Sequence, residues 1–178
     1  MIQIKDIDPL LVEKESFMTS LTSTYKVEKE DSLYILKMGG KWRRDHLIHE
    51  RKVLLVAREI DGITHLIKTY WIKNPSLFRR DIALLKEYFD GSTLWKSRLD
   101  GRIEANKLQK KLEGIVKELH SIGIADLDLH SGNIVVSPDQ QEIKIIDLGQ
   151  CKYFNIFRGT KFERYKSRDL RHLESLFG

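Results

Sequence analysis

The segment from residue 112 to residue 149 constrains the fold of this chain more than any other, because a helical pattern, a polar loop and two short apolar runs follow one another. Apolar residues recur at helical spacing ahead of Gly123, namely Leu112, Ile115, Val116 and Leu119. Two apolar runs, 134–136 and 143–146, flank the turn-rich sequence SPDQQ. The segment therefore predicts a helix, a polar loop and a β-hairpin.

Three oxygen-bearing side chains lie in this segment. Asp128 and Asn133 belong to the polar loop, and Asp147 follows the second apolar run, where Leu148-Gly149 permits a sharp turn. Each residue alone could simply close a turn through local hydrogen bonds. Their joint spacing around a hairpin instead predicts that the three converge on one cation. One carboxylate to orient a hydroxyl, plus oxygen ligands for magnesium, is what phosphoryl transfer requires.

The same segment resembles the protein-kinase-like superfamily. DLHSGN matches the D-L-x-x-x-N part of the kinase catalytic loop. IDLG occupies the position of the kinase D-F-G motif. The resemblance implies that Asp128 is the catalytic base, that Asn133 is a magnesium ligand and that Asp147 is the principal magnesium ligand. It also implies ATP and Mg²⁺ as cofactors.

Two departures from the kinase pattern affect the prediction. Asp126 and Leu127 replace the usual His-Arg pair, so control through a phosphorylated activation loop is not expected. His130 replaces the lysine that is common in protein-serine kinases. The motif DLHxGN resembles that of the aminoglycoside and choline kinase branch.

A kinase-like protein also needs a lysine that holds the nucleotide phosphates. The apolar run Tyr34-Ile35-Leu36 ends in Lys37, as does the kinase V-A-I-K strand. Helical periodicity over residues 43–59 places Glu50 on an apolar face, where a carboxylate is costly unless it is paired. We therefore predict an ion pair between Lys37 and Glu50, with Glu59 as the weaker candidate.

The apolar run 82–85 and the following residues resemble the fifth strand and the hinge of a kinase. Backbone groups of Glu87, Tyr88 and Phe89 would then bind the edge of adenine, and the interlobe hinge would span about residues 87–91. Ser92 or Thr93 could cap a following helix that contains Leu94 and Trp95.

The glycine-rich phosphate loop of kinases has no counterpart. Between Phe17 and Tyr34 the chain carries Thr19-Ser20-Leu21-Thr22-Ser23-Thr24 and no glycine. Small polar residues can still approach phosphates closely. This departure is the main argument for a pseudokinase.

Only one further helix is expected beyond Asp147, over residues 167–177, with Leu170, Leu173, Leu176 and Phe177 as its core face. Asp169 stands where kinases have an aspartate that binds the catalytic-loop backbone. The chain thus resembles compact atypical members: RIO-like kinases, the small kinase of the tRNA threonylcarbamoyl complex and lipopolysaccharide-core sugar kinases. The expected fold is α+β and minimally bilobal, a single domain over 1–178. It would have an N-lobe of about 1–89 with an antiparallel sheet and one helix, and a truncated, mainly helical C-lobe of about 91–178.

The segment 152–171 is basic and aromatic, and the whole chain has a formal charge of +5. Such a segment would attract an anionic acceptor or partner. The alternative interpretation is a charged surface that is exposed to water and binds no partner. The single cysteine, Cys151, excludes an internal disulfide and favours a cytoplasmic protein. No transmembrane segment is expected, which leaves peripheral contact at the inner membrane face as the only membrane role.

Three functions remain open at the level of the sequence. The leading hypothesis is an ATP-dependent kinase acting on protein serine or threonine. The second is a kinase for a lipopolysaccharide-core sugar or another small molecule, and the third is a non-catalytic pseudokinase that serves as a binding module.

Overall fold

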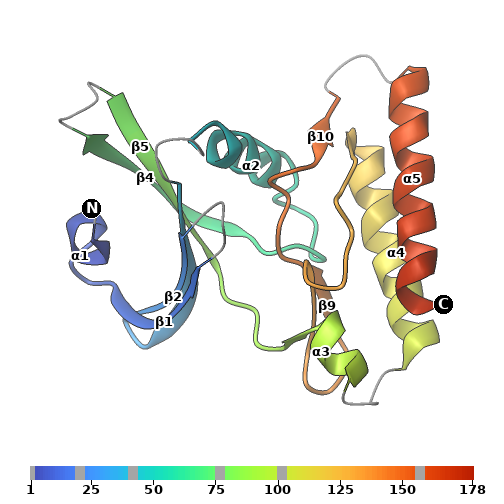
Figure 1. The fold of residues 1–178 in the computed structure, drawn as a ribbon, viewed down its shortest axis with the longest axis horizontal. Coiled ribbons are helices and arrows are strands. Elements are labelled where there is room, and N and C mark those ends of the chain that lie inside the picture. The colour runs from blue at the N-terminus through green and yellow to red at the C-terminus, as the bar shows by residue number, and fades with distance from the viewer. Residues whose placement is uncertain (1–2, 19–22, 40–43, 75–78, 100–103, 155–158) are drawn as a thin grey trace. The chain divides into compact units, whose positions relative to one another are not determined.

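The computed structural model describes residues 3–18, 23–39, 44–74, 79–99, 104–154 and 159–178 (Figure 1). These residues form a mixed α+β structure with an antiparallel sheet and five helices, which confirms the predicted class. The chain divides into two compact units. Unit 1 comprises Met1–Leu55 and His65–Tyr88, and unit 2 comprises Val56–Thr64 and Phe89–Gly178.

Unit 1 contains a five-stranded antiparallel sheet in the order β1-β2-β3-β5-β4. Its strands are β1 (Val12–Met18), β2 (Ser23–Lys29), β3 (Ser32–Met38), β4 (Leu66–Asn74) and β5 (Arg79–Glu87). The β2–β3 hairpin turns through Glu30 and Asp31, whose φ angles are 51° and 60°. Two consecutive positive φ angles are the geometry of a type I′ turn, whose twist matches that of the strands.

The alternation of side chains along β5 divides the core of unit 1 in two. Ile82 and Leu84 pack with Leu47 of α2 (Arg44–Val56). Ala83 and Leu85 point to the opposite face, because neighbouring residues of a strand face opposite sides. That second cluster is covered by Ile4 and Ile7 of α1 (Ile4–Ile7). The sheet thus has α2 on one face and the N-terminal segment on the other.

Unit 2 is built around two long helices that pack side by side, α4 (Ala105–Ser121) and α5 (Thr160–Phe177) (Figure 1). A short helix, α3 (Leu94–Leu99), precedes them. One small sheet has the order β6-β8-β9, from β6 (Ser92–Thr93), β8 (Ile134–Val136) and β9 (Ile143–Ile145). The other pairs β7 (Ile124–Ala125) with β10 (Lys152–Tyr153). The helix and hairpin predicted from the 112–149 segment are therefore confirmed.

The start of α5 differs from the prediction. The helix begins at Thr160 rather than at residue 167, and Leu170 is 37% exposed rather than part of the core. The buried residues of α5 are Phe162, Asp169, Leu173 and Leu176. Phe162 is the one buried residue of α5 before Asp169, so residues 160–166 lack the apolar periodicity that would predict a helix.

Candidate functional site

Lys37 and Glu50 form the predicted ion pair within unit 1. Lys37 lies in β3 opposite Leu84 of β5, and Glu50 shares the buried side of α2 with Leu47 and Val53. The Lys37 ammonium lies 2.8 Å from Oε2 of Glu50, whose side chain is 1% exposed. The alternative, Glu59, follows the end of α2 and pairs with Arg58 at the surface.

A second lysine, Lys86, binds the same carboxylate and was not anticipated. Its ammonium lies 2.7 Å from Oε1 of Glu50, and its side chain is 4% exposed. The sequence does carry a signal for this contact. Ile82, Leu84 and Lys86 alternate along β5, so all three face α2. The resemblance to a kinase assigns the residues after 85 to the hinge and predicts no partner for Lys86.

The predicted adenine-binding residues lie at and beyond the end of β5. The Glu87 amide donates to the His65 carbonyl at 2.9 Å, and the Glu87 carboxylate accepts from the His65 amide at 3.1 Å. The Tyr88 hydroxyl accepts from the Lys26 ammonium at 3.0 Å. Phe89 belongs to unit 2, where the Lys144 ammonium lies 5.2 Å from its ring centroid. The Glu87 amide is thus already engaged by the protein.

In unit 2 a buried carboxylate holds the loop that carries Asp128. Asp169 of α5 accepts the backbone amides of Asp126 and Leu127, each at 2.9 Å, and its Oδ2 lies 2.9 Å from Nε2 of His120. Asp126 and Asp128 have φ angles of 62° and 50°. Left-handed backbone at two aspartates is sterically costly, and it persists where surrounding contacts enforce it. Asp169, which is 1% exposed, supplies such contacts at Asp126, and the carbonyl of Asp128 accepts the side-chain amide of Asn133.

Asn133 and Asp147 lie at the same end of the β8–β9 hairpin. Asn133 immediately precedes β8 and Asp147 follows β9, so antiparallel pairing brings the two segments together. The Ile146 amide donates to the Asn133 carbonyl at 2.9 Å. The Asn133 side-chain amide in turn donates to the Asp128 carbonyl at 3.2 Å. One chain of hydrogen bonds therefore links the segments of all three predicted residues.

The donor set at this end of the hairpin fits magnesium. Nδ2 of Asn133 is used in the bond to Asp128, which leaves its side-chain oxygen as the ligand atom. Oδ1 of Asp147 accepts the Gly149 amide at 2.8 Å, which fixes the orientation of the carboxylate. Among the described residues, no three His, Cys, Asp or Glu side chains gather as an all-protein metal site. Mg²⁺ does not need one, since it commonly takes one or two protein ligands together with phosphates and water.

Two predicted features fall partly outside the described residues. The glycine-free segment lies between β1 and β2, and the last residues that pair in these strands are Met18 and Ser23. Residues 19–22 are not among the described residues. The basic segment 152–171 comprises β10 and the first two-thirds of α5, and residues 155–158 are likewise not among the described residues.

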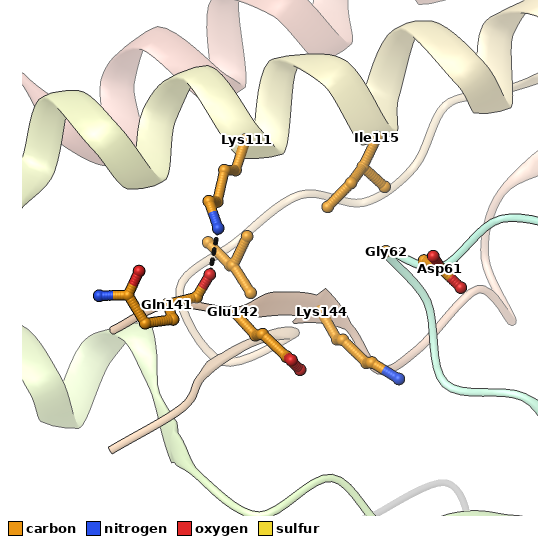
Figure 2. Close-up of a pocket in the computed structure, with 8 residues that line it drawn as sticks. Asp61, Gly62, Lys111, Ile115, Gln141, Glu142 and Lys144 are labelled. Atoms are coloured by element: carbon orange, nitrogen blue, oxygen red, sulfur yellow. Dashed lines mark hydrogen bonds between the residues drawn. The ribbon is translucent and has the colours of Figure 1, made fainter. Parts of the chain in front are cut away.

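Unit 2 also has a surface hollow that contains none of the predicted site residues. It has a volume of about 470 Å³ and lies between α4, the β8–β9 hairpin and residues 61–62 (Figure 2). Lys111 donates to the Gln141 carbonyl across one end of it. Its lining combines Ile115 and Ile143 with charged side chains of both signs: Asp61, Lys111, Glu142 and Lys144. This mixture does not define one class of ligand.

No protein-family model matches the sequence, and no curated protein shows significant similarity to it. Within the described ranges, none of the helices combines the length and the hydropathy that a bilayer crossing requires.

Proposed function

We propose that this protein is a magnesium- and ATP-dependent phosphotransferase of the atypical protein-kinase type. It transfers the γ-phosphate of ATP to a hydroxyl, and a protein serine or threonine is the favoured acceptor. In this proposal the whole chain is one kinase-like domain, with unit 1 as its N-lobe and unit 2 as its C-lobe.

The observation that carries the proposal is the link between Asn133 and Ile146 at one end of the β8–β9 hairpin. It supports a shared site for Asp128, Asn133 and Asp147, which is the set that phosphoryl transfer requires. The buried pair of Lys37 and Glu50 adds independent support. Buried charges are costly, so an ion pair buried to this degree is a candidate for a functional role.

Each residue then has a distinct role. Asp128 accepts the proton of the acceptor hydroxyl as that oxygen bonds to the γ-phosphorus and the bond to the bridging oxygen of ADP breaks. Asn133 and Asp147 would hold Mg²⁺, which neutralises charge on the phosphates. Lys37 binds the α- and β-phosphates, and Glu50 orients Lys37. Because the Glu87 amide donates to His65, adenine would bind groups of Tyr88 and Phe89 or the Glu87 carbonyl.

A sugar or small-molecule acceptor is the second candidate. His130 stands two residues after Asp128, is exposed, and accepts the Gly132 amide at 3.1 Å through Nδ1. An imidazole in place of the usual lysine suits a polar, uncharged acceptor as well as a peptide. A non-catalytic binding module is the third candidate, and the glycine-free segment between β1 and β2 supports it.

Transfer of radiolabelled γ-phosphate from ATP tests the proposal. The wild-type chain would be compared with Asp147→Ala and with Glu118→Ala, a control that removes an exposed carboxylate of α4. Protein-bound label, ADP and free phosphate would be measured separately. We expect protein label that disappears in Asp147→Ala and persists in Glu118→Ala.

The other outcomes separate the alternatives. ADP that forms only when a glycan or metabolite extract is added would favour the small-molecule kinase. If the wild-type protein neither transfers phosphate nor binds ATP, the enzyme proposal is wrong and the binding module becomes the better account.

A further inference from the structure

Four of the five lysines and arginines of α5 share one face of the helix, and the fifth, Lys166, pairs with Glu163. Lys161, Arg164, Arg168 and Arg171 follow one another at intervals of three or four residues, so they form one stripe, which we call the basic face. Lys161, Arg164 and Arg171 are exposed. The two glutamates of α5, Glu163 and Glu174, are eleven residues apart and share a different face.

The basic face begins where a cation does not help α5. Lys161 lies in the first turn of the helix, where the positive end of the helix dipole disfavours cations. Three of the cations also surround one ring. The side-chain charges of Arg168, Arg164 and Lys161 lie 5.0, 5.7 and 6.0 Å from the Tyr165 centroid. The contacts with the Tyr165 ring are attractive and Arg168 is paired with Asp126, but three exposed cations on one face still create a positive potential that attracts an anionic partner.

The basic face is connected to the loop that carries Asp128. Arg168 forms an ion pair with the carboxylate of Asp126, two residues before Asp128. The next residue of α5, Asp169, binds the backbone amides of Asp126 and Leu127. A partner that binds the basic face therefore lies next to the proposed catalytic loop, within the same compact unit.

We propose that the basic face binds an acidic segment of the protein acceptor, adjacent to the serine or threonine that is phosphorylated. This inference rests on the proposed function and adds the substrate class to it. From Lys161 to Arg171 the helix rises about 15 Å. An extended peptide covers this length with roughly five residues, so a short run of aspartates or glutamates is sufficient.

Two other anionic partners suit this face less well. Single-stranded nucleic acid is usually bound through open aromatic rings, but Tyr165 is ringed by cations and by Phe154, whose centroid lies 6.0 Å away. A membrane-surface helix inserts its apolar side into the lipid. The apolar side of α5 is already buried in unit 2 through Phe162, Leu173 and Leu176.

Binding measurements without nucleotide test the inference separately from catalysis. The probe is a fluorescent peptide with one serine between short runs of glutamate, and a matched peptide has glutamine in place of glutamate. The triple variant Lys161→Gln/Arg164→Gln/Arg171→Gln removes three charges from the basic face. The control, Lys96→Gln/Lys110→Gln/Lys117→Gln, removes three exposed charges from α3 and α4.

We expect the triple variant to bind the acidic peptide roughly tenfold more weakly, because three exposed ion pairs each contribute modestly. We expect the control variant to bind within about twofold of wild type and the glutamine peptide to bind no variant measurably. Equal weakening in both variants would overturn the inference, since it would then reflect net charge alone. Tighter binding of a uridine oligonucleotide or of phosphatidylglycerol vesicles to the same face would also overturn it. If the protein binds the acidic peptide but transfers no phosphate, the proposed enzyme activity is wrong. The inference that the basic face binds an acidic segment would still hold.

Discussion

The Lys86 ammonium lies 2.7 Å from Oε1 of Glu50, and these side chains are only 4% and 1% exposed. Because Lys37 occupies the other oxygen of the same carboxylate, Glu50 joins β3 and β5 to α2 with two charged hydrogen bonds. A carboxylate that holds two strands at once is expected to fix the position of α2 on the sheet.

The first prediction concerns the free energy of unfolding of Glu50→Gln. This substitution leaves two buried ammonium groups without their carboxylate, so we expect a loss of about 3 kcal/mol or more. Urea unfolding followed by circular dichroism measures it. Glu59→Gln is the control, because its pair with Arg58 is exposed and should contribute less than about 1 kcal/mol. Equal losses in the two variants would contradict the inferred role of Glu50.

The second prediction separates the two lysines. Lys86→Met preserves the pair of Lys37 and Glu50, so we expect phosphate transfer to persist while the protein loses about 1–3 kcal/mol of stability. Lys37→Met removes the proposed phosphate ligand and should reduce transfer by roughly a hundredfold or more. Steady-state kinetics with ATP, measured beside urea unfolding of each variant, compares them. If Lys86→Met abolishes transfer in a folded protein, the roles assigned to the two lysines are wrong.

The third prediction concerns Asp169 as a positioning residue. Asn at this position has one acceptor oxygen and would direct an amine toward a backbone amide, so the loop at Asp126 and Leu127 should shift. We expect Asp169→Asn to lower the turnover of phosphate transfer by about a hundredfold with little change in ATP affinity. Glu163→Gln on the exposed side of the same helix serves as the control. A parallel loss of ATP affinity in Asp169→Asn would indicate general unfolding instead.

The fourth prediction follows from Asp8, which anchors the N-terminal segment to the sheet. Burial opposes ionisation of its carboxyl, but hydrogen bonds from Lys29, Tyr70 and the Leu10 amide outweigh burial and lower the pKa to about 2. A lowered pKa stabilises the folded state above the unfolded-state pKa of 3.8 and loses this contribution as the pH falls toward 2. We therefore expect wild type to lose on the order of 1 kcal/mol over this window.

The matched variant for that experiment is Asp8→Asn, which has no carboxyl to titrate. Its unfolding free energy should be lower than that of wild type at neutral pH, and the difference should shrink between pH 4 and pH 2. A constant difference over this range would show that the Asp8 carboxyl is not the group responsible.

The fifth prediction tests the close approach of Gly62 to Ile115 beside the hollow in Figure 2. A Cβ atom at residue 62 would overlap the side chain of Ile115, so Gly62→Ala should cost about 1–3 kcal/mol of stability. Adding Ile115→Ala removes the overlapping atoms, and the double variant should lose less than the sum of the two single changes. Thermal unfolding of all three variants measures this coupling, and strict additivity would argue against the contact.

Local patterns predicted the parts of this protein whose partners are close in sequence. The helix ahead of Gly123 and the hairpin between residues 134 and 145 follow from periodicity and from a short turn, and both are present. The pair of Lys37 and Glu50 was also predictable, because a carboxylate on an apolar helical face requires a nearby cation.

The first two turns of α5 escaped prediction because Phe162 is their one buried residue, and a single apolar position does not define a helical period. Asp169, in the second half of the helix, occupies a core position. In the structure it is stable because two backbone amides and His120 satisfy it.

Periodicity and short turns were sufficient to predict the helix before Gly123 and the hairpin that separates Asn133 from Asp147, because both depend on residues close together in the chain. The resemblance to kinases added the expectation that Asp169 binds the backbone of the loop before Asp128, and this contact is present. The sharing of Glu50 between Lys37 and Lys86 follows from the packing of β3, β5 and α2, because a buried charge is stabilised by partners that lie far away in the sequence.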